Sequence, residues 1–124
     1  MNKNLVSFRI LPKRLRMENK EKHFKNREVQ DVIDIIGGRW RSGILASLCD
    51  KEKRFNELKR DLGSITPTTL IKELKYLEMN KLVTRKAETD SSFVYSLTKH
   101  GESLEPLIGQ IVFWGQKHRK VVLG

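Results

Sequence analysis

The side chains of this chain that could do chemistry are hydroxyl and cationic groups gathered in two short stretches. Between residues 66 and 76, threonines are followed by lysines at intervals that place several of them on one side of a helix. Such groups near the start of a helix can contact base edges in the major groove of a duplex. Arg85 and Lys86 form a second basic pair, suited to backbone phosphate, although an ordinary solvated strand would look the same. The predicted nucleic-acid contacts are Arg54, Thr66, Thr68, Thr69, Lys72, Lys75, Tyr76, Arg85 and Lys86.

The other reactive residues do not suggest a catalytic or metal site. His23, His100 and His118 show no ligand spacing, and the single cysteine, Cys49, excludes a cysteine-cluster zinc site. Serines and threonines cluster at predicted caps and turns, where hydrogen bonds to the backbone explain them. Gly37-Gly38 follows a helical pattern and not a strand, so it does not resemble a phosphate-binding loop. We therefore predict no enzymatic activity, no metal and no cofactor.

Two short helices joined by a tight turn are expected to position the first stretch. Residues 54–62 predict a helix that Gly63 ends, because glycine adopts the positive φ of a helix C-cap without a steric cost. Thr66 and Pro67 predict the start of the second helix, as N-cap and first helical residue. A pair of surface helices in any small α domain would show the same pattern. The apolar residues expected to face inward are Phe55, Leu58, Leu62, Leu70, Leu74 and Leu77.

Two β-favouring runs, residues 82–87 and 93–97, follow the second helix. The turn-rich link between them, residues 88–92, has the length of a hairpin connection. A hairpin directly after a helix-turn-helix is the wing of a winged helix. The predicted fold class is therefore mainly α with a small β-hairpin wing, a winged helix-turn-helix.

Apolar helices are predicted on both sides of this unit. One covers residues 28–36, and another follows over residues 40–48, before a charged turn at residues 51–54. The last helix is capped by Thr98 and should be kinked or broken by Pro106, which lacks an N–H. Its apolar stripe is broader than one small domain needs, which favours a partner chain. The predicted dimer interface comprises Val29, Val32, Ile33, Leu104, Leu107, Ile108, Ile111 and Trp114.

The bulk charge favours a polyanionic partner. The 124 residues carry a formal net charge of +10, which suits nucleic acid or an anionic membrane surface. Ribosome-associated proteins share this composition. No run approaches the ~18 apolar residues of a membrane span, and the N-terminal apolar patches are too short for a secretory signal. We expect a cytoplasmic protein with no membrane partner.

The charge is concentrated at the N-terminus. Residues 1–27 hold nine Lys or Arg against Glu18 and Glu21, so residues 1–26 are predicted to form a basic, partly disordered arm, much of it either mobile or a weak helix. Such an arm either binds phosphate or serves only solubility, and Met17 is an alternative start. Residues 27–118 are predicted to form the winged helix-turn-helix domain with N- and C-terminal dimerisation helices, and residues 119–124 a frayed tail.

Several motifs together resemble the HxlR-type winged helix-turn-helix regulators of bacteria, which are similar in shape to the MarR group. Residues 34–40 (DIIGGRW) resemble the family's I-G-G-K-W, and residues 54–58 (RFNEL) resemble R-F-x-E-L. Residues 65–70 (ITPTTL) resemble I-S-P-x-x-L, residues 74–78 (LKYLE) resemble L-x-x-L-E, and residues 95–98 (YSLT) resemble Y-x-L-T. The motifs occur in order and at matching spacing over about residues 27–115.

The resemblance implies a sequence-specific transcriptional regulator that binds double-stranded DNA at palindromic operators as a homodimer. The first and last helices would form the dimer. Arg27 stands where the family often has a cysteine, thirteen residues before Trp40. Cys49 lies at the carbonyl end of its helix among apolar residues, which disfavours a thiolate. We therefore predict an unidentified, non-covalent small-molecule effector and no cysteine redox switch.

Two other functions fit parts of the pattern. An RNA- or ribosome-associated basic winged helix would share the charge but would use stacking aromatic residues, and Tyr76 is the only exposed aromatic residue expected. A winged helix that binds only proteins would leave the basic excess unexplained.

Overall fold

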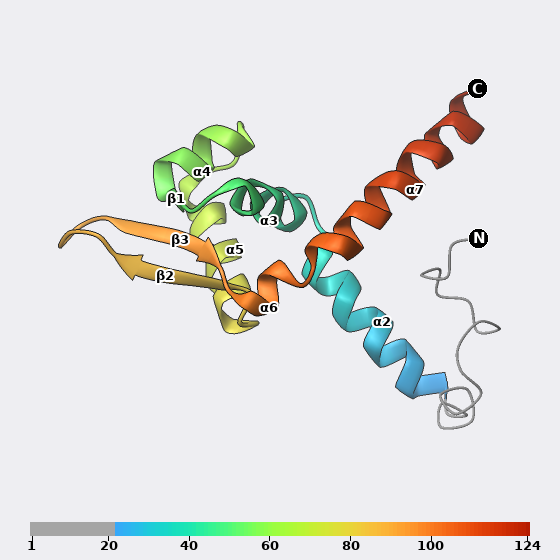
Figure 1. Cartoon of the computed structure of the whole chain (residues 1–124), viewed down its shortest axis with the longest axis horizontal. Coiled ribbons are helices and arrows are strands. Elements are labelled where there is room, and N and C mark those ends of the chain that lie inside the picture. The colour runs from blue at the N-terminus through green and yellow to red at the C-terminus, as the bar shows by residue number, and fades with distance from the viewer. Residues whose placement is uncertain (1–21) are drawn as a thin grey trace. The chain divides into compact units, whose positions relative to one another are not determined.

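The computed structural model describes the backbone of residues 22–124 and the side chains of residues 26–124. Contacts divide the chain into two units, residues 1–34 and 35–124, and each is described by itself. The described part is mainly helical, with one antiparallel sheet of strand order β1-β3-β2 (Figure 1). The predicted fold class, a winged helix-turn-helix with a β-hairpin wing, is confirmed.

The described part of the first unit is the helix α2 (Lys22–Ile36), whose last two residues belong to the second unit. It begins within the segment predicted as a basic arm or weak helix, so residues 22–26 of that segment are helical. The remainder of the predicted arm, residues 1–21, lies outside the described residues. After α2 the chain turns at Gly38, which has a φ of +75° that L side chains rarely adopt.

The second unit contains the helix-turn-helix and the wing. In chain order its elements are α3 (Arg41–Asp50), β1 (Lys53–Arg54), α4 (Phe55–Leu62), α5 (Pro67–Met79), β2 (Val83–Ala87), β3 (Phe93–Leu97), α6 (Lys99–Glu102) and α7 (Glu105–Leu123). α4 and α5 form the predicted helix pair, and β2 and β3 form the predicted hairpin (Figure 1).

The core of the second unit joins α3, α4 and α5 to one face of the sheet. Leu58, Leu70 and Leu77 are fully buried, as the three- and four-residue repeat predicts. The hairpin closes this core through Val83 and Tyr95. Burial of these side chains fixes which face of α5 points outward.

Two local predictions differ from the structure, and a third is confirmed. The sequence predicts a turn over residues 51–54, but Lys53 and Arg54 form β1 and pair with β3 opposite Tyr95 and Val94. The break predicted at Pro106 is present, since α6 ends at Glu102 and Pro106 lies in the first turn of α7. The tail, residues 119–124, is predicted to fray, yet α7 is helical to Leu123.

Candidate nucleic-acid interface

The start of α5 is fixed by a local cap. Thr66 Oγ1 accepts a hydrogen bond from the Thr69 N–H at 3.2 Å, and Pro67 supplies the pre-set φ of the first turn. Gly63 ends α4 with a φ of +77°, and its N–H donates to the Lys59 carbonyl. The helix-turn-helix therefore has the caps that its sequence predicted.

The outward face of α5 carries the side chains best placed to contact a duplex. Thr68, Lys72 and Lys75 are exposed there, and they border a shallow hollow with Ile71 and Met79. Met79 is 81% exposed and Ile71 46%. The face thus combines cations and a hydroxyl with apolar groups that could meet thymine methyls.

Thr66 and Thr69 contribute to α5 chiefly as its cap. The Thr66 hydroxyl also donates to Thr69 Oγ1 at 2.9 Å, so both hydroxyls are engaged within the first turn. The Thr69 side chain is half-buried, beside the outward face and not on it. Of the three threonines predicted as contacts, Thr68 points most clearly outward.

Tyr76 lines the same hollow of α5, but it is less exposed than the sequence suggested. Its ring is half-buried against the core, and the Arg41 guanidinium lies over it, 3.6 Å from the ring centroid. Arg41 Nε also donates to Glu73 Oε1 at 2.6 Å, which ties α3 to α5. Aromatic residues that are more exposed lie on α7, where Phe113 is 55% and Trp114 52% exposed.

Arg85 and Lys86 lie on opposite faces of the wing. Arg85 pairs with Tyr95, whose side chain is buried, and its guanidinium stacks over Phe93 at 4.4 Å. Lys86 pairs with Val94 and lies on the other face, because successive residues of a strand alternate. The two cations therefore cannot contact the same stretch of phosphate backbone from one surface.

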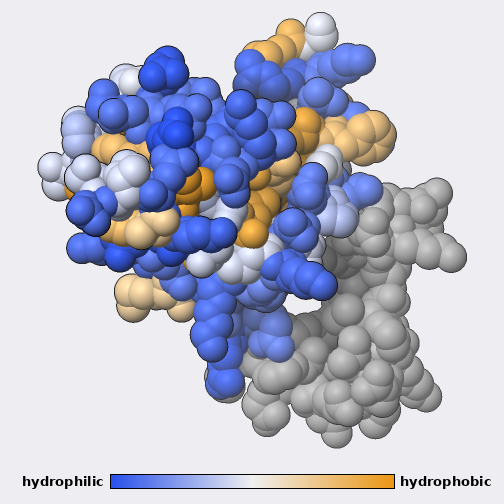
Figure 2. Space-filling model, turned by 60° about the vertical axis from the view of Figure 1, so that its left-hand side comes forward, coloured by the Kyte–Doolittle hydropathy of each residue, from blue (hydrophilic) through white to orange (hydrophobic). Residues whose placement is uncertain are grey.

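A groove of about 730 Å³ runs between α4, α5 and the wing. Four cationic side chains, one each from β1, α4, α5 and β2, line it, together with the carboxylates of Glu57 and Glu78. Arg60 was missed by the sequence analysis, because its place on α4 opposite the wing depends on tertiary packing. Hydrophilic residues cover most of the described surface in view, with smaller apolar patches between them (Figure 2). The groove cations are Arg54, Arg60, Lys75 and Arg85.

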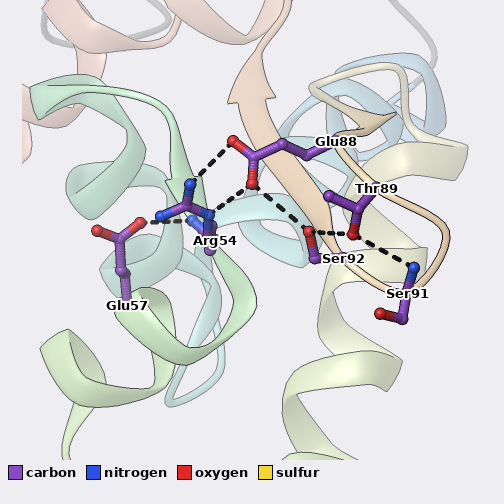
Figure 3. Close-up of polar contacts among 6 residues, drawn as sticks. All are labelled: Arg54, Glu57, Glu88, Thr89, Ser91 and Ser92. Atoms are coloured by element: carbon purple, nitrogen blue, oxygen red, sulfur yellow. Dashed lines mark hydrogen bonds and ion pairs between the residues drawn. The ribbon is translucent and has the colours of Figure 1, made fainter.

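Arg54 is already bound by a carboxylate. Its Nε and Nη2 donate to the two oxygens of Glu88, at 2.6 and 2.9 Å, and its backbone N–H donates to Glu57 Oε1 (Figure 3). Ser92 and Thr89 continue this network through the wing tip. The hydrogen bond from Arg54 lowers the Glu88 pKa, so the pair stays ionised at neutral pH.

A second ion pair lies beneath the helix-turn-helix. The buried side chain of Lys53 donates to Asp61 Oδ2 at 2.5 Å and to Ser47 Oγ at 3.0 Å. These contacts lower the Asp61 pKa, first through the hydrogen bond from Lys53 and then through that from Ser47. The pair joins β1 and α3 to α4, so it positions the helix-turn-helix and does not face a ligand.

The described residues include no group of three or more His, Cys, Asp or Glu side chains that could hold a metal ion. Within the same part of the chain, no helix is long and apolar enough to cross a membrane.

Residues 35–122 match the family described as HxlR-like helix-turn-helix. The chain belongs to this family. The motif resemblance in the sequence is thereby confirmed, and so is the winged helix-turn-helix geometry that goes with it. This HxlR-like protein is a transcriptional regulator of the helix-turn-helix type.

Known proteins of similar sequence and structure are also regulators. The HTH-type transcriptional regulator YybR of Bacillus subtilis is 35% identical over 111 residues, which are 86% of this chain and 89% of YybR. The reduced form of the redox regulator HypR is 37% identical with a TM-score of 0.70, covering 77% of this chain and 96% of HypR. The quinone-bound regulator YodB from B. subtilis is 27% identical with a TM-score of 0.66, covering 73% of this chain and 98% of YodB.

Proposed function

We propose that this HxlR-like regulator binds double-stranded DNA at a palindromic operator as a homodimer. The observation that carries the proposal is the outward face of α5 beside a groove with cations from four elements. Thr68 and Lys72 in the first turns of α5 would read base edges, because that end of a recognition helix enters the major groove. Lys75, Arg60 and Arg85 would contact the phosphates that flank it.

The proposed dimer rests on apolar side chains that the described monomer leaves uncovered. Leu107, Ile111 and Trp114 are 38%, 44% and 52% exposed on one stripe of α7. Leu104 and Ile108, also predicted for the interface, pack partly against the protein's own core. A stripe of this kind is the usual sign of a protein–protein contact.

On α2, Val29 and Ile33 are 45% and 50% exposed. Val32 is half-buried on the same helix. These residues repeat at three- and four-residue intervals, so they form one apolar stripe. They would complete the interface with α7.

A footprint on the chain's own promoter region, at physiological salt, tests the DNA proposal. A dimer should protect two half-sites about one helical turn apart, on one side of the duplex. Protection of a single half-site, or tighter binding to single-stranded RNA than to any duplex, would overturn it. The second outcome would favour the RNA-associated alternative. The exposed Phe113 and Trp114 lie on α7, away from the groove-lining residues of α4, α5 and the wing.

Substitution of Ile111 tests the dimer. Ile111→Asp places a charge in the proposed contact, where an unpaired buried charge is strongly unfavourable, so sedimentation should show monomers. Phe113→Asp is the matched control, because Phe113 is similarly exposed but lies on the opposite side of α7. Both variants should keep the wild-type circular dichroism. A folded Ile111→Asp protein that sediments as a dimer would refute the interface.

The proposed effector is a non-covalent small molecule. YodB is known in a quinone-bound form, and the redox regulator HypR is known in reduced and oxidised forms. In this chain Cys49 is half-buried, and its pKa is raised by burial and then by the carboxylates of Glu105 and Glu102. A raised thiol pKa lowers the thiolate fraction, which disfavours oxidation at this residue.

A further inference from the structure

The wing tip of this protein carries negative charge where it approaches the groove. Residues 87–93 (AETDSSF) contain Glu88 and Asp90 and no Lys or Arg. Phosphate-binding elements are normally rich in Lys and Arg. The tip is therefore poorly suited to contact the DNA backbone directly, and its carboxylates need another explanation.

Glu88 has a defined partner. Arg54 lies 34 residues away in sequence, lines the groove, and gives both Nε and Nη2 to the two Glu88 oxygens. This parallel pair of hydrogen bonds is the arrangement that a guanidinium also makes with phosphate. The side chains remain 56% and 39% exposed, so solvent and a polyanion can reach the pair.

From these contacts, and resting on the proposed DNA binding, we propose that Glu88 is a built-in competitor of DNA phosphate for Arg54. While Glu88 holds the Nε and Nη2 edge of the guanidinium, that edge of Arg54 cannot make a bidentate phosphate contact, and Arg60, Lys75 and Arg85 are left as the main phosphate-binding cations of the groove. Glu88 thus lowers the sequence-independent part of the affinity for DNA. The base-reading face of α5 then contributes a larger share of binding to the operator.

The network around the pair supports this role. Ser92 Oγ lies 3.5 Å from Glu88 Oε1 and 3.1 Å from Thr89 Oγ1, so the turn itself orients the carboxylate (Figure 3). Glu57 accepts the Arg54 backbone N–H at 2.8 Å, which anchors the arginine at the start of α4. Both partners are therefore held in place before DNA arrives.

The test measures the binding of a duplex of random sequence as a function of salt. Glu88→Gln releases Arg54, and one added phosphate contact should steepen the slope of log K against log[salt] by about 0.9. The added slope acts over the tenfold decrease in salt from about 1 M to 0.1 M. At 0.1 M salt the variant should therefore bind about eightfold tighter than the wild type, a factor of 10 to the power 0.9. All sequences should gain alike, because a phosphate contact reads no base.

Asp90→Asn is the matched control, because it removes the same charge from the same turn without touching Arg54. It should gain less than half as much as Glu88→Gln. In the double variant Arg54→Gln/Glu88→Gln the gain should vanish, whereas Arg54→Gln alone should leave the wild-type slope unchanged. An Arg54→Gln slope shallower by about 0.9 would show that Arg54 already contacts phosphate, and equal effects of Glu88→Gln and Asp90→Asn would show only general charge. Either result overturns the proposal.

Weaker binding by folded Glu88→Gln would also overturn the proposal, since it would make the pair a support for the wing. The random duplex keeps this test separate from the proposed function. Competition between Glu88 and phosphate requires only attraction between the protein and a polyanion, whereas the proposed function requires preference for an operator.

Discussion

Gly101 lies at the corner that joins the wing to α7, and its replacement by alanine should be severely destabilising. A Cβ on residue 101 would stand 2.1 Å from the Leu82 carbonyl oxygen and 3.2 Å from Leu97 Cδ2. The Leu82 oxygen also accepts the Thr98 N–H at 3.0 Å. The obstructing atom is thus a backbone oxygen that a hydrogen bond holds in place, and not the end of a flexible side chain.

The size of this contact sets how much Gly101→Ala should lower the free energy of unfolding. Carbon–oxygen contacts are ordinarily about 3.3 Å or longer, so the α6 and Leu82 backbones would have to separate by roughly 1 Å. Overpacking of this kind costs ~1–3 kcal/mol, and a disrupted Thr98 hydrogen bond adds about 1 kcal/mol. Alanine regains up to about 1 kcal/mol in helix propensity. The expected loss is about 2 kcal/mol, or roughly 8–16 °C in Tm for a domain of this size.

Urea unfolding followed by circular dichroism measures this loss. Gly109→Ala in α7 is the control, because no atom lies within 4 Å of the place that its new methyl group would take. Its exposed helical site should gain up to about 1 kcal/mol. A Gly101→Ala midpoint equal to that of the wild type would refute the reasoning, since it would mean that α6 can move from Leu82 without cost.

Three further outcomes are expected. Lys72→Ala should change the preferred DNA sequence, because a lysine contact with guanine discriminates between bases by ~1–3 kcal/mol. Arg85→Ala should weaken binding to all sequences and flatten the salt slope by about one unit. Selection from random duplexes measures both effects. Asp61 has a lowered pKa in the fold, so its contribution to stability is present above its unfolded pKa and lost as pH falls below about 4; acid unfolding of Asp61→Asn should lack that loss. Diamide should leave DNA binding unchanged in both the wild type and Cys49→Ser, and a loss in the wild type alone would show a reactive thiol.

The parts of the fold that depend on local chemistry could be predicted from the sequence. The cap of Thr66, the proline after it and the positive φ of Gly63 act within one turn of their own helix, so residue type and spacing were sufficient. The inward leucines followed from the helical repeat alone. The two-residue strand β1 could not be found in this way, because only its pairing with β3 across the domain makes it a strand.

The candidate site was predicted less completely, because tertiary contacts decide which side chains reach solvent. Helical periodicity placed Tyr76 on the outward face, where it does line the hollow, but it could not show that Arg41 from α3 lies over the ring. The basic character of Arg54 suggested a phosphate contact, but the sequence could not show that Glu88 binds the Nε and Nη2 edge of its guanidinium. In each case a side chain from a segment distant in the sequence contacts the residue and changes which partners it can reach.

The end of α7 is more regular than its sequence suggested. Residues 116–120 are polar and basic, which suggested fraying, but cations near a helix C-terminus interact favourably with the exposed carbonyls of its last turn. The helix therefore continues to Leu123, and Val121 and Leu123 are left 82% and 72% exposed at its end. Because α7 also carries the stripe of Ile111, the added length extends the apolar surface available to a second copy of the chain. The same basic residues that seemed to end the helix thus help to stabilise the element on which the proposed dimer depends.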